Sequence, residues 1–136
     1  MIKIAICGIA GRMCGRIAHL ALESDDIDVS GGVEAAGNPS VGRDAGEVIG
    51  AKPLGFQVLE DPKQVVGQAD VVVAFTAPPD GTVEAAKVTG AAGKAMVIGT
   101  TGLSEAQLGT LKEAVRDVAC VLASNFTVGV TLLTQL

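Results

Sequence analysis

The sequence predicts an α/β fold in which a doubly wound parallel sheet is covered by helices on both faces. Apolar runs alternate with amphipathic segments along the whole chain of 136 residues, as parallel sheets with crossover helices require. Apolar residues make up 49% of the chain, mostly Ala, Val, Ile and Leu, whereas aromatic residues make up 2%. Such side chains suit strands that are buried on both faces. A chain of this length forms one substantial core, so residues 1–136 are expected to be a single domain.

Five strands are predicted from continuous apolar runs that are bounded by turn-forming residues. They cover residues 2–7, 28–33, 70–75, 95–98 and 119–123. The third is the clearest, because three valines, an alanine and a phenylalanine follow Asp70 directly. A further short strand is predicted near residues 56–59.

Three helices are predicted between these strands, over residues 12–23, 79–91 and 104–117. The first is amphipathic. Its apolar side carries Met13, Ile17, Leu20, Ala21 and Ser24, and its opposite, polar side carries Arg12, Arg16, His19 and Glu23. His19 is expected to be solvated. The second begins after two prolines, which suit a first helical turn. The third begins with a capping box of Ser104 and Gln107. Single helical turns are predicted near residues 44–49 and 62–67, and the rest of residues 35–55 is a glycine-rich loop.

The last ten residues, 127–136, have the pattern of a helix that is still beginning when the sequence stops. Natural termini are usually polar and frayed. We therefore expect the chain to be one domain of a longer protein.

The charge and the cysteines of the chain argue against several classes of function. The formal net charge of −5 disfavours a nucleic-acid surface, because phosphate backbones are held by clustered Lys and Arg. No apolar run reaches the roughly 18 residues of a membrane span, and the first strand begins without a signal-like segment, so a cytoplasmic location is expected. The spacing of Cys7, Cys14 and Cys120 matches no zinc site, so these thiols are expected to be reduced core residues.

The most informative segment joins the first strand to the first helix and reads Gly8-Ile9-Ala10-Gly11-Arg12-Met13-Cys14-Gly15. Glycines there allow a tight turn and a close approach to phosphate, and the N–H groups of the helix attract negative charge. Arg12 adds a positive charge. A simple tight turn is the alternative, but the position between a clear strand and a clear helix favours a Rossmann-type site for the pyrophosphate of NAD(P)(H).

Other candidate residues follow the remaining strand ends, which meet at one edge of a parallel sheet. Glu34 lies about 20 residues after the glycine turn, where an acidic side chain binds ribose hydroxyls. The other strand ends are Phe75-Thr76, Gly99-Thr100-Thr101-Gly102 and Ala123-Ser124-Asn125-Phe126. Structural alternatives stay open, since Glu34 also fits a solvated carboxylate and residues 99–102 also fit a turn before the helix cap.

Residues for acid–base or metal chemistry are missing from these strand ends. No histidine, lysine or pair of carboxylates is placed there, and the sequence contains no ATP-type phosphate loop or metal-ligand cluster. Hydride transfer tolerates this absence, because the nicotinamide supplies the reactive atom and the protein orients it. No catalytic residue is therefore assigned, and the expected cofactor is NADH, NADPH or both.

Five segments, in this order and at these spacings, resemble the amino-terminal domain of the dihydrodipicolinate reductase (4-hydroxy-tetrahydrodipicolinate reductase) family. They are GIAGRM at 8–13, GRDAGE at 42–47, VAFT at 73–76, MVIGTTG at 96–102 and ASNFTVGV at 123–130. The resemblance implies an oxidoreductase that transfers hydride from NADH or NADPH to a cyclic dicarboxylate in lysine and diaminopimelate biosynthesis. It also implies a homotetrameric full-length protein whose proton donor lies in a second domain, so that this chain alone would not turn over.

The resemblance also assigns roles to the site residues. The pyrophosphate would be wrapped by residues 8–13 and the adenine ribose held by Glu34. The nicotinamide would be bordered by Gly99, Thr100 and Thr101, and Thr101 and Gly102 would face the substrate carboxylate. The complete cofactor set is Gly8, Ile9, Ala10, Gly11, Arg12, Met13, Glu34, Phe75, Thr76, Gly99, Thr100, Thr101, Ala123, Ser124, Asn125 and Phe126.

Two positions depart from the family pattern. Cys14 stands where the family usually has glycine, and Ala35 stands where some members carry an arginine for the 2′-phosphate of NADP. NADH is therefore expected to bind at least as well as NADPH.

Two other functions fit the same segments. A stand-alone nucleotide-sensing or CoA-binding module would catalyse nothing, and an aspartate- or homoserine-type dehydrogenase shares the two-domain plan. The pair of segments at 99–102 and 123–126 favours the reductase family over the other dehydrogenases.

Overall fold

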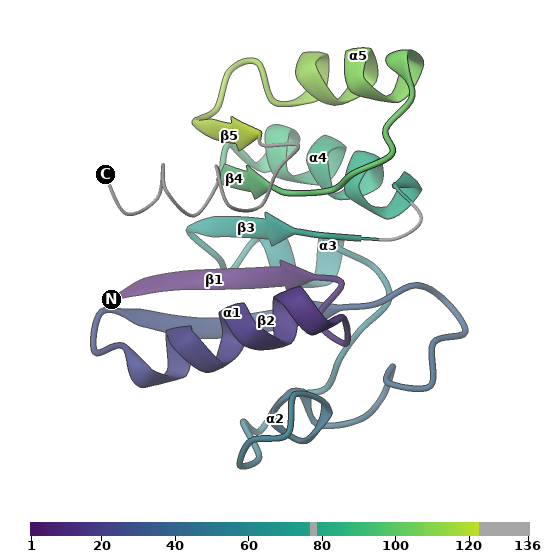
Figure 1. Cartoon of the computed structure of the whole chain (residues 1–136). Helices are drawn as coiled ribbons and strands as arrows, with labels where there is room; N and C mark the ends of the chain where they lie inside the picture. The colour runs from purple at the N-terminus through teal and green to yellow at the C-terminus, as the bar shows by residue number, and fades with distance from the viewer. Residues whose placement is uncertain (77–78, 123–136) are drawn as a thin grey trace.

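The computed structural model describes residues 1–76 and 79–122. Five parallel strands form one sheet in the order β2-β1-β3-β4-β5 (Figure 1). Their bounds are β1 Ile2–Cys7, β2 Ile27–Val33, β3 Val71–Ala74, β4 Ala95–Ile98 and β5 Cys120–Leu122. The predicted doubly wound α/β fold and its five strands are confirmed. The winding reverses between β1 and β3, and in such sheets ligands bind beyond the carboxyl ends of the strands at this point.

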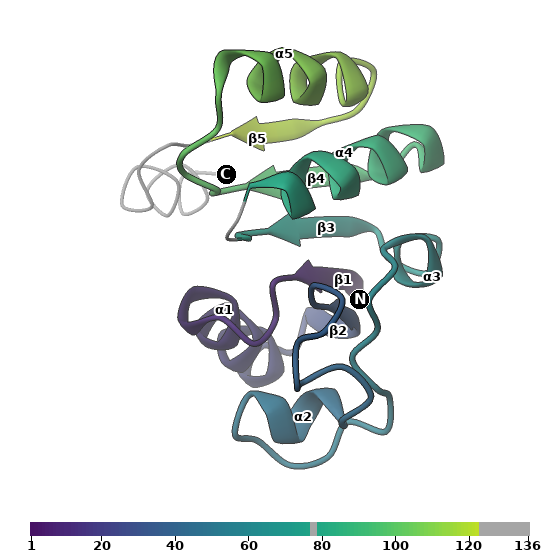
Figure 2. The same ribbon diagram turned by 90° about the vertical axis from the view of Figure 1, so that its right-hand side faces the viewer.

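Helices cover both faces of the sheet (Figures 1 and 2). Their bounds are α1 Arg12–Glu23, α2 Ala45–Val48, α3 Lys63–Val66, α4 Asp80–Ala92 and α5 Glu105–Ala114. On one face α1 packs against β1 and β2, and on the other face α3, α4 and α5 share a core with the strands. The predicted capping box begins α5, where the Ser104 hydroxyl accepts from the Gln107 N–H at 3.1 Å. The helix expected at residues 127–136 lies outside the described residues.

Alternate residues of each strand point into the two cores, as a strand period of two requires. Ala5 and Cys7 belong to the core beneath α3, α4 and α5, whereas Ile4 and Ile6 belong to the core beneath α1. All four are less than 10% exposed. This double burial is the reason that the strands read as continuous apolar runs.

The predicted buried side of α1 is partly wrong. Leu20 is 54% exposed, and the fully packed residues are Cys14, Ala18 and Ala21. These three small side chains lie on one face at spacings of four and three residues, and they let the helix approach the sheet closely. The expectation that His19 is merely solvated is also wrong, because its Nε2 lies 2.6 Å from the carbonyl oxygen of Ile49 and donates to it.

The strand predicted at residues 56–59 is not formed. Gln57 and Leu59 make only isolated bridges, one antiparallel to Asp44 and one parallel to Val33. The segment returns from a loop with positive-φ glycines and meets the edge of β2 only at Leu59, which donates to the Gly32 carbonyl at 3.0 Å and accepts from the Glu34 N–H at 2.9 Å. A single point of contact cannot continue a ladder.

The loop before this segment is organised around the carboxylate of Asp44. This side chain accepts hydrogen bonds from the N–H groups of Gly46 and Leu54 at 2.8 and 2.9 Å, and from those of Glu47 and Gly55 at 3.3 and 2.9 Å. These backbone hydrogen bonds, that from Leu54 foremost, lower the pKa of Asp44. A carboxylate that accepts several amide protons favours its charged form.

Replacing Asp44 with asparagine is expected to lower the Tm at neutral pH. The asparagine side chain has an NH₂ group in place of one carboxylate oxygen, so some of the backbone N–H groups that now donate to Asp44 would lose their acceptor. The folded pKa of Asp44 lies below its unfolded value of about 3.9. Its stabilising effect is therefore complete above that pH and is lost as the pH falls through the folded pKa. Thermal unfolding of both proteins between pH 7 and pH 2.5 should show the Tm difference shrinking with acid. A constant difference would contradict this account.

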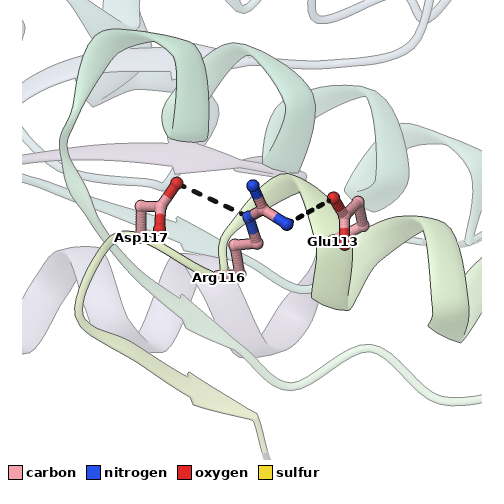
Figure 3. A network of polar contacts seen from close by, with 3 residues as sticks. All are labelled: Glu113, Arg116 and Asp117. Carbon is pink, nitrogen blue, oxygen red and sulfur yellow. Dashed lines mark ion pairs between the residues drawn. The ribbon is translucent and has the colours of Figure 1, made fainter.

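The surface beyond α5 carries an ion-pair cluster of Glu113, Arg116 and Asp117 (Figure 3). Arg116 lies 3.0 Å from Glu113 and 3.6 Å from Asp117, and all three side chains are well exposed. Exposed pairs contribute little to stability, so this cluster is a solvated surface. None of the helices described here is long and apolar enough to cross a membrane.

Candidate nucleotide-binding site

The site is centred on the turn between β1 and α1, at the carboxyl edge of the sheet (Figure 1). Gly8 has a φ of +89°, and a Cβ atom there would lie 2.7 Å from the carbonyl oxygen of Phe75. Any side chain at Gly8 would therefore be strained and would also push β1 away from the end of β3. The Gly8 N–H donates to the Val33 carbonyl at 2.8 Å. This glycine thus sets the turn between its two neighbouring strands.

The turn leads directly into the N-terminus of α1. Gly11 is the N-cap of α1, and no side chain caps the helix there. The first amides of a helix have no partner within the helix and carry partial positive charge. Arg12, at the first helical position, is exposed. The turn and these amides make a surface that suits the oxygen atoms of a phosphate group.

Glu34 is connected directly to the glycine turn. The Ala10 N–H donates to Glu34 Oε2 at 2.7 Å, which places the carboxylate beside the turn and at the end of β2. Glu34 is half-buried. The structure therefore brings together two parts of the predicted site that are separated by 24 residues in the sequence.

A pocket of about 250 Å³ extends from Gly8 and Glu34 to the N-terminal half of α4. It is lined by Cys7, Gly8, Val33, Glu34, Ala35, Glu60, Pro62, Thr76, Asp80, Gly81, Glu84 and Ala85. Four of these residues are acidic and none is basic. Sequence reasoning missed Glu60, Asp80 and Glu84. Asp80 could have been found, since it follows the predicted strand end at 75–76, but nothing in the sequence places Glu60 or Glu84 at this edge.

A second hollow, of about 340 Å³, lies on the other side of the glycine turn. It is lined by Ile9, Ala10, Gly11, Arg12, Gly15, Arg16, His19, Val48 and Ile49. The glycine turn therefore lies between an acidic pocket and a hollow that contains basic side chains.

Gly99 is required by the ring of Phe75. A Cβ atom at Gly99 would come within 2.0 Å of Phe75 Cε1, and the Gly99 N–H donates to the Ala74 carbonyl at 3.0 Å. The ends of β3 and β4 are thereby packed together. Thr100, which follows, is buried, whereas Thr101 and Gly102 are exposed at the same edge. The predicted segments at 75–76 and 99–102 are thus neighbours, while Ala123–Phe126 lie outside the described residues.

Cys14 fills the position where the family pattern has glycine. It is fully buried, and its Sγ lies 3.6 Å from the carbonyl oxygen of Cys7, to which the thiol donates. Burial raises the pKa of Cys7 and of Cys14 to about 12. Both thiols are therefore protonated and unreactive at neutral pH. The packing role expected for Cys7 and Cys14 is confirmed, and Cys14 fits beneath the turn.

The doubly wound parallel sheet and the glycine turn at its carboxyl edge define a Rossmann-type domain. The chain belongs to the dihydrodipicolinate reductase family, because the family model described as "Dihydrodipicolinate reductase, N-terminus" matches residues 2–126. This match decides between the reductase family and the other two-domain dehydrogenases. Enzymes of this family use NADH or NADPH, so the expectation of a nicotinamide cofactor is confirmed at the level of the family.

Relatives of known name agree with this assignment. The 4-hydroxy-tetrahydrodipicolinate reductase of Syntrophobacter fumaroxidans is 41% identical over 98% of this chain and 49% of its own length. That of Rubrobacter xylanophilus is 44% identical over 98% of this chain and 48% of its own. The chain therefore spans about half the length of these reductases.

Solved structures show the same fold. A dipicolinate-bound dihydrodipicolinate reductase from Paenisporosarcina sp. TG-14 superposes with a TM-score of 0.72 and 21% identity, covering 99% of this chain and 51% of that one. A probable dehydrogenase from Thermotoga maritima superposes with a TM-score of 0.70 and 17% identity over 90% of this chain and 36% of that one.

Proposed function

We propose that this chain is the NAD(P)H-binding domain of a 4-hydroxy-tetrahydrodipicolinate reductase. The single observation that carries the proposal is the uncapped N-terminus of α1 behind the Gly8–Gly11 turn. The turn accommodates a pyrophosphate because Gly11 has no side chain in front of the first amides of α1. The cofactor supplies a hydride from its nicotinamide when it is bound. The residues of this chain bind and orient it.

Each part of the edge has a proposed role. The turn of residues 8–13 wraps the pyrophosphate, which accepts from the amides of Arg12 and Met13 at the start of α1, and Arg12 adds positive charge. The N–H groups of Ile9, Ala10 and Gly11 donate to Val33, Glu34 and Gly8 and shape the turn. Glu34 accepts hydrogen bonds from the adenine ribose, in the pocket of about 250 Å³ that it lines with Ala35. The close packing of Phe75 against Gly99 supports a nicotinamide position beside Thr100 and Thr101. Family resemblance adds residues 123–126 to the nicotinamide pocket, and Thr101 and Gly102 to the binding of the substrate carboxylate.

The activity belongs to the longer protein. We propose that it reduces a cyclic dicarboxylate in lysine and diaminopimelate biosynthesis, as a cytoplasmic homotetramer whose second domain supplies the proton donor. The described edge offers hydrogen-bonding and packing groups, and no residue there is proposed as a catalytic acid. The 136-residue chain is therefore expected to bind the cofactor without turning over the substrate.

A titration of the 136-residue chain with NADH and with ADP-ribose tests the nucleotide role. Both ligands carry the pyrophosphate and the adenosine that the turn and Glu34 are proposed to hold, so both are expected to bind saturably by calorimetry. Adenosine alone, without phosphate, should bind far more weakly. A chain that is folded by circular dichroism but takes up neither NADH nor ADP-ribose would contradict the proposal.

A further inference from the structure

Three threonine hydroxyls form a connected cluster beneath the carboxyl edge of the sheet. Thr76 follows β3, Thr82 lies in the first turn of α4, and Thr100 follows β4. Thr82 is completely buried and Thr100 is 4% exposed. The Oγ1 atom of Thr82 lies 2.8 Å from that of Thr76 and 2.5 Å from that of Thr100. One side chain of α4 therefore joins the ends of two strands.

The hydrogen bonds of the cluster have a consistent direction. Thr100 Oγ1 accepts from the Thr76 N–H at 3.2 Å and donates to the Ala74 carbonyl at 3.5 Å. Because Thr100 directs its own proton to Ala74, the Thr82 hydroxyl can donate to Thr100 and accept from Thr76. Buried hydroxyls that are linked in this way strengthen one another and define a single geometry. The Thr82 hydroxyl joins α4 to both of the other hydroxyls, in addition to the direct hydrogen bond from the Thr76 N–H to Thr100.

The two ends of this cluster lie at different parts of the proposed cofactor site. Thr76 lines the acidic pocket together with Glu34. Thr100 directly follows Gly99, whose backbone lies against the ring of Phe75. The position of residues 99–101 relative to β3 is thus set partly through α4.

We propose that Thr82 is a positioning residue, whose hydroxyl holds residues 99–101 in place for the nicotinamide end of the cofactor. The inference rests on the proposed function, since it assigns this residue to the same site. Not every buried threonine of α4 has this positioning role. Thr89 of α4 is equally buried, but its hydroxyl donates to the Ala85 carbonyl of its own helix at 2.7 Å.

Thr82→Val keeps the shape of the side chain and removes the hydroxyl, whereas Thr82→Ser keeps the hydroxyl. Each variant is titrated with NADH, detected by its nicotinamide fluorescence, and with ADP-ribose, which lacks the nicotinamide. Thr82→Val is expected to weaken NADH binding about tenfold, the effect of one buried hydrogen bond, and to leave ADP-ribose binding within about twofold. Thr82→Ser should restore most of the NADH affinity. Thr89→Val, the matched control, should change neither ligand.

The outcomes separate this inference from the proposed function. Wild-type protein that binds neither ligand overturns the proposed function. Wild-type protein that binds both, with Thr82→Val either unchanged or weakened equally toward both, overturns the positioning role. If Thr82→Val does not fold, Thr100→Val interrupts the same cluster from β4 and should show the same selective loss of NADH. Retained ADP-ribose binding shows that a variant is folded.

Discussion

Replacing Gly11 with aspartate is expected to abolish nucleotide binding while leaving the chain folded. Gly11 has φ −72° and ψ 157°, an extended conformation that any residue adopts. An aspartate there would cap the first amides of α1 with its own carboxylate, the arrangement that helix N-termini prefer. The same carboxylate would occupy the place proposed for the pyrophosphate and repel it. NADH affinity should fall at least about a hundredfold, through lost amide donors and like-charge repulsion.

The steric part of this change has its own controls. A Cβ atom at Gly11 would lie 3.2 Å from the Gly8 carbonyl oxygen, a tight contact that a small local shift relieves. Gly11→Ala therefore measures the effect of the Cβ alone, and Gly11→Asn adds an uncharged group of the same size as aspartate. Affinity should fall in the order Gly, Ala, Asn, Asp, while the Tm of Gly11→Asp stays at or above that of the wild type. Calorimetric titration tests the predicted order of affinities, and thermal unfolding tests the predicted Tm. Undiminished NADH binding by Gly11→Asp would rule out the turn as the phosphate site.

NADPH is expected to bind about tenfold more weakly than NADH, and Ala35→Arg is expected to remove this preference. Glu34, Glu60, Asp80 and Glu84 line the pocket proposed for the adenosine, without any basic residue among its lining. A 2′-phosphate carries nearly two negative charges. Repulsion from several carboxylates at about 8 Å, screened at physiological salt, amounts to on the order of 1–2 kcal/mol, roughly a factor of ten in affinity.

An arginine at residue 35 would meet the 2′-phosphate with paired hydrogen bonds, which are among the stronger polar contacts in proteins. Ala35 is exposed, so the longer side chain is accommodated without repacking. NADPH affinity should rise by at least about tenfold in Ala35→Arg, with NADH affinity almost unchanged. Ala35→Gln, which adds a shorter polar side chain without charge, should leave the ratio of the two dissociation constants as in the wild type. A wild-type chain that prefers NADPH would refute the electrostatic account.

Much of the site could be predicted because its parts lie in short segments with strong local signals. The turn at residues 8–15 follows a clear strand and precedes a clear helix, so its position at the carboxyl edge follows from chain direction alone. The predicted ends at 75–76 and 99–102 meet at that edge for the same reason, since parallel strands bring their carboxyl ends together. Family resemblance supplied the roles of these segments.

The parts that could not be predicted depend on contacts between distant residues. Asp44 binds the N–H groups of Leu54 and Gly55 because the loop folds back on itself. Glu60 and Glu84 meet in one pocket only when α4 packs beside the loop that follows β2. The hydroxyl of Thr82 lies within hydrogen-bond distance of Thr76, which follows β3, and of Thr100, which follows β4. None of these pairs has a fixed spacing in the sequence.

The amino-acid sequence by itself determined the order of strands and helices, their burial on both faces and the location of the glycine turn between β1 and α1. These depend on apolar periodicity and on glycine, which act within a few residues. Only the tertiary structure decided which side of α1 is buried, that residues 56–59 form no strand, and which carboxylates surround the pocket. Those outcomes depend on how closely helices and loops approach the sheet. Small residues such as Ala18 permit that approach, and no local pattern specifies its geometry.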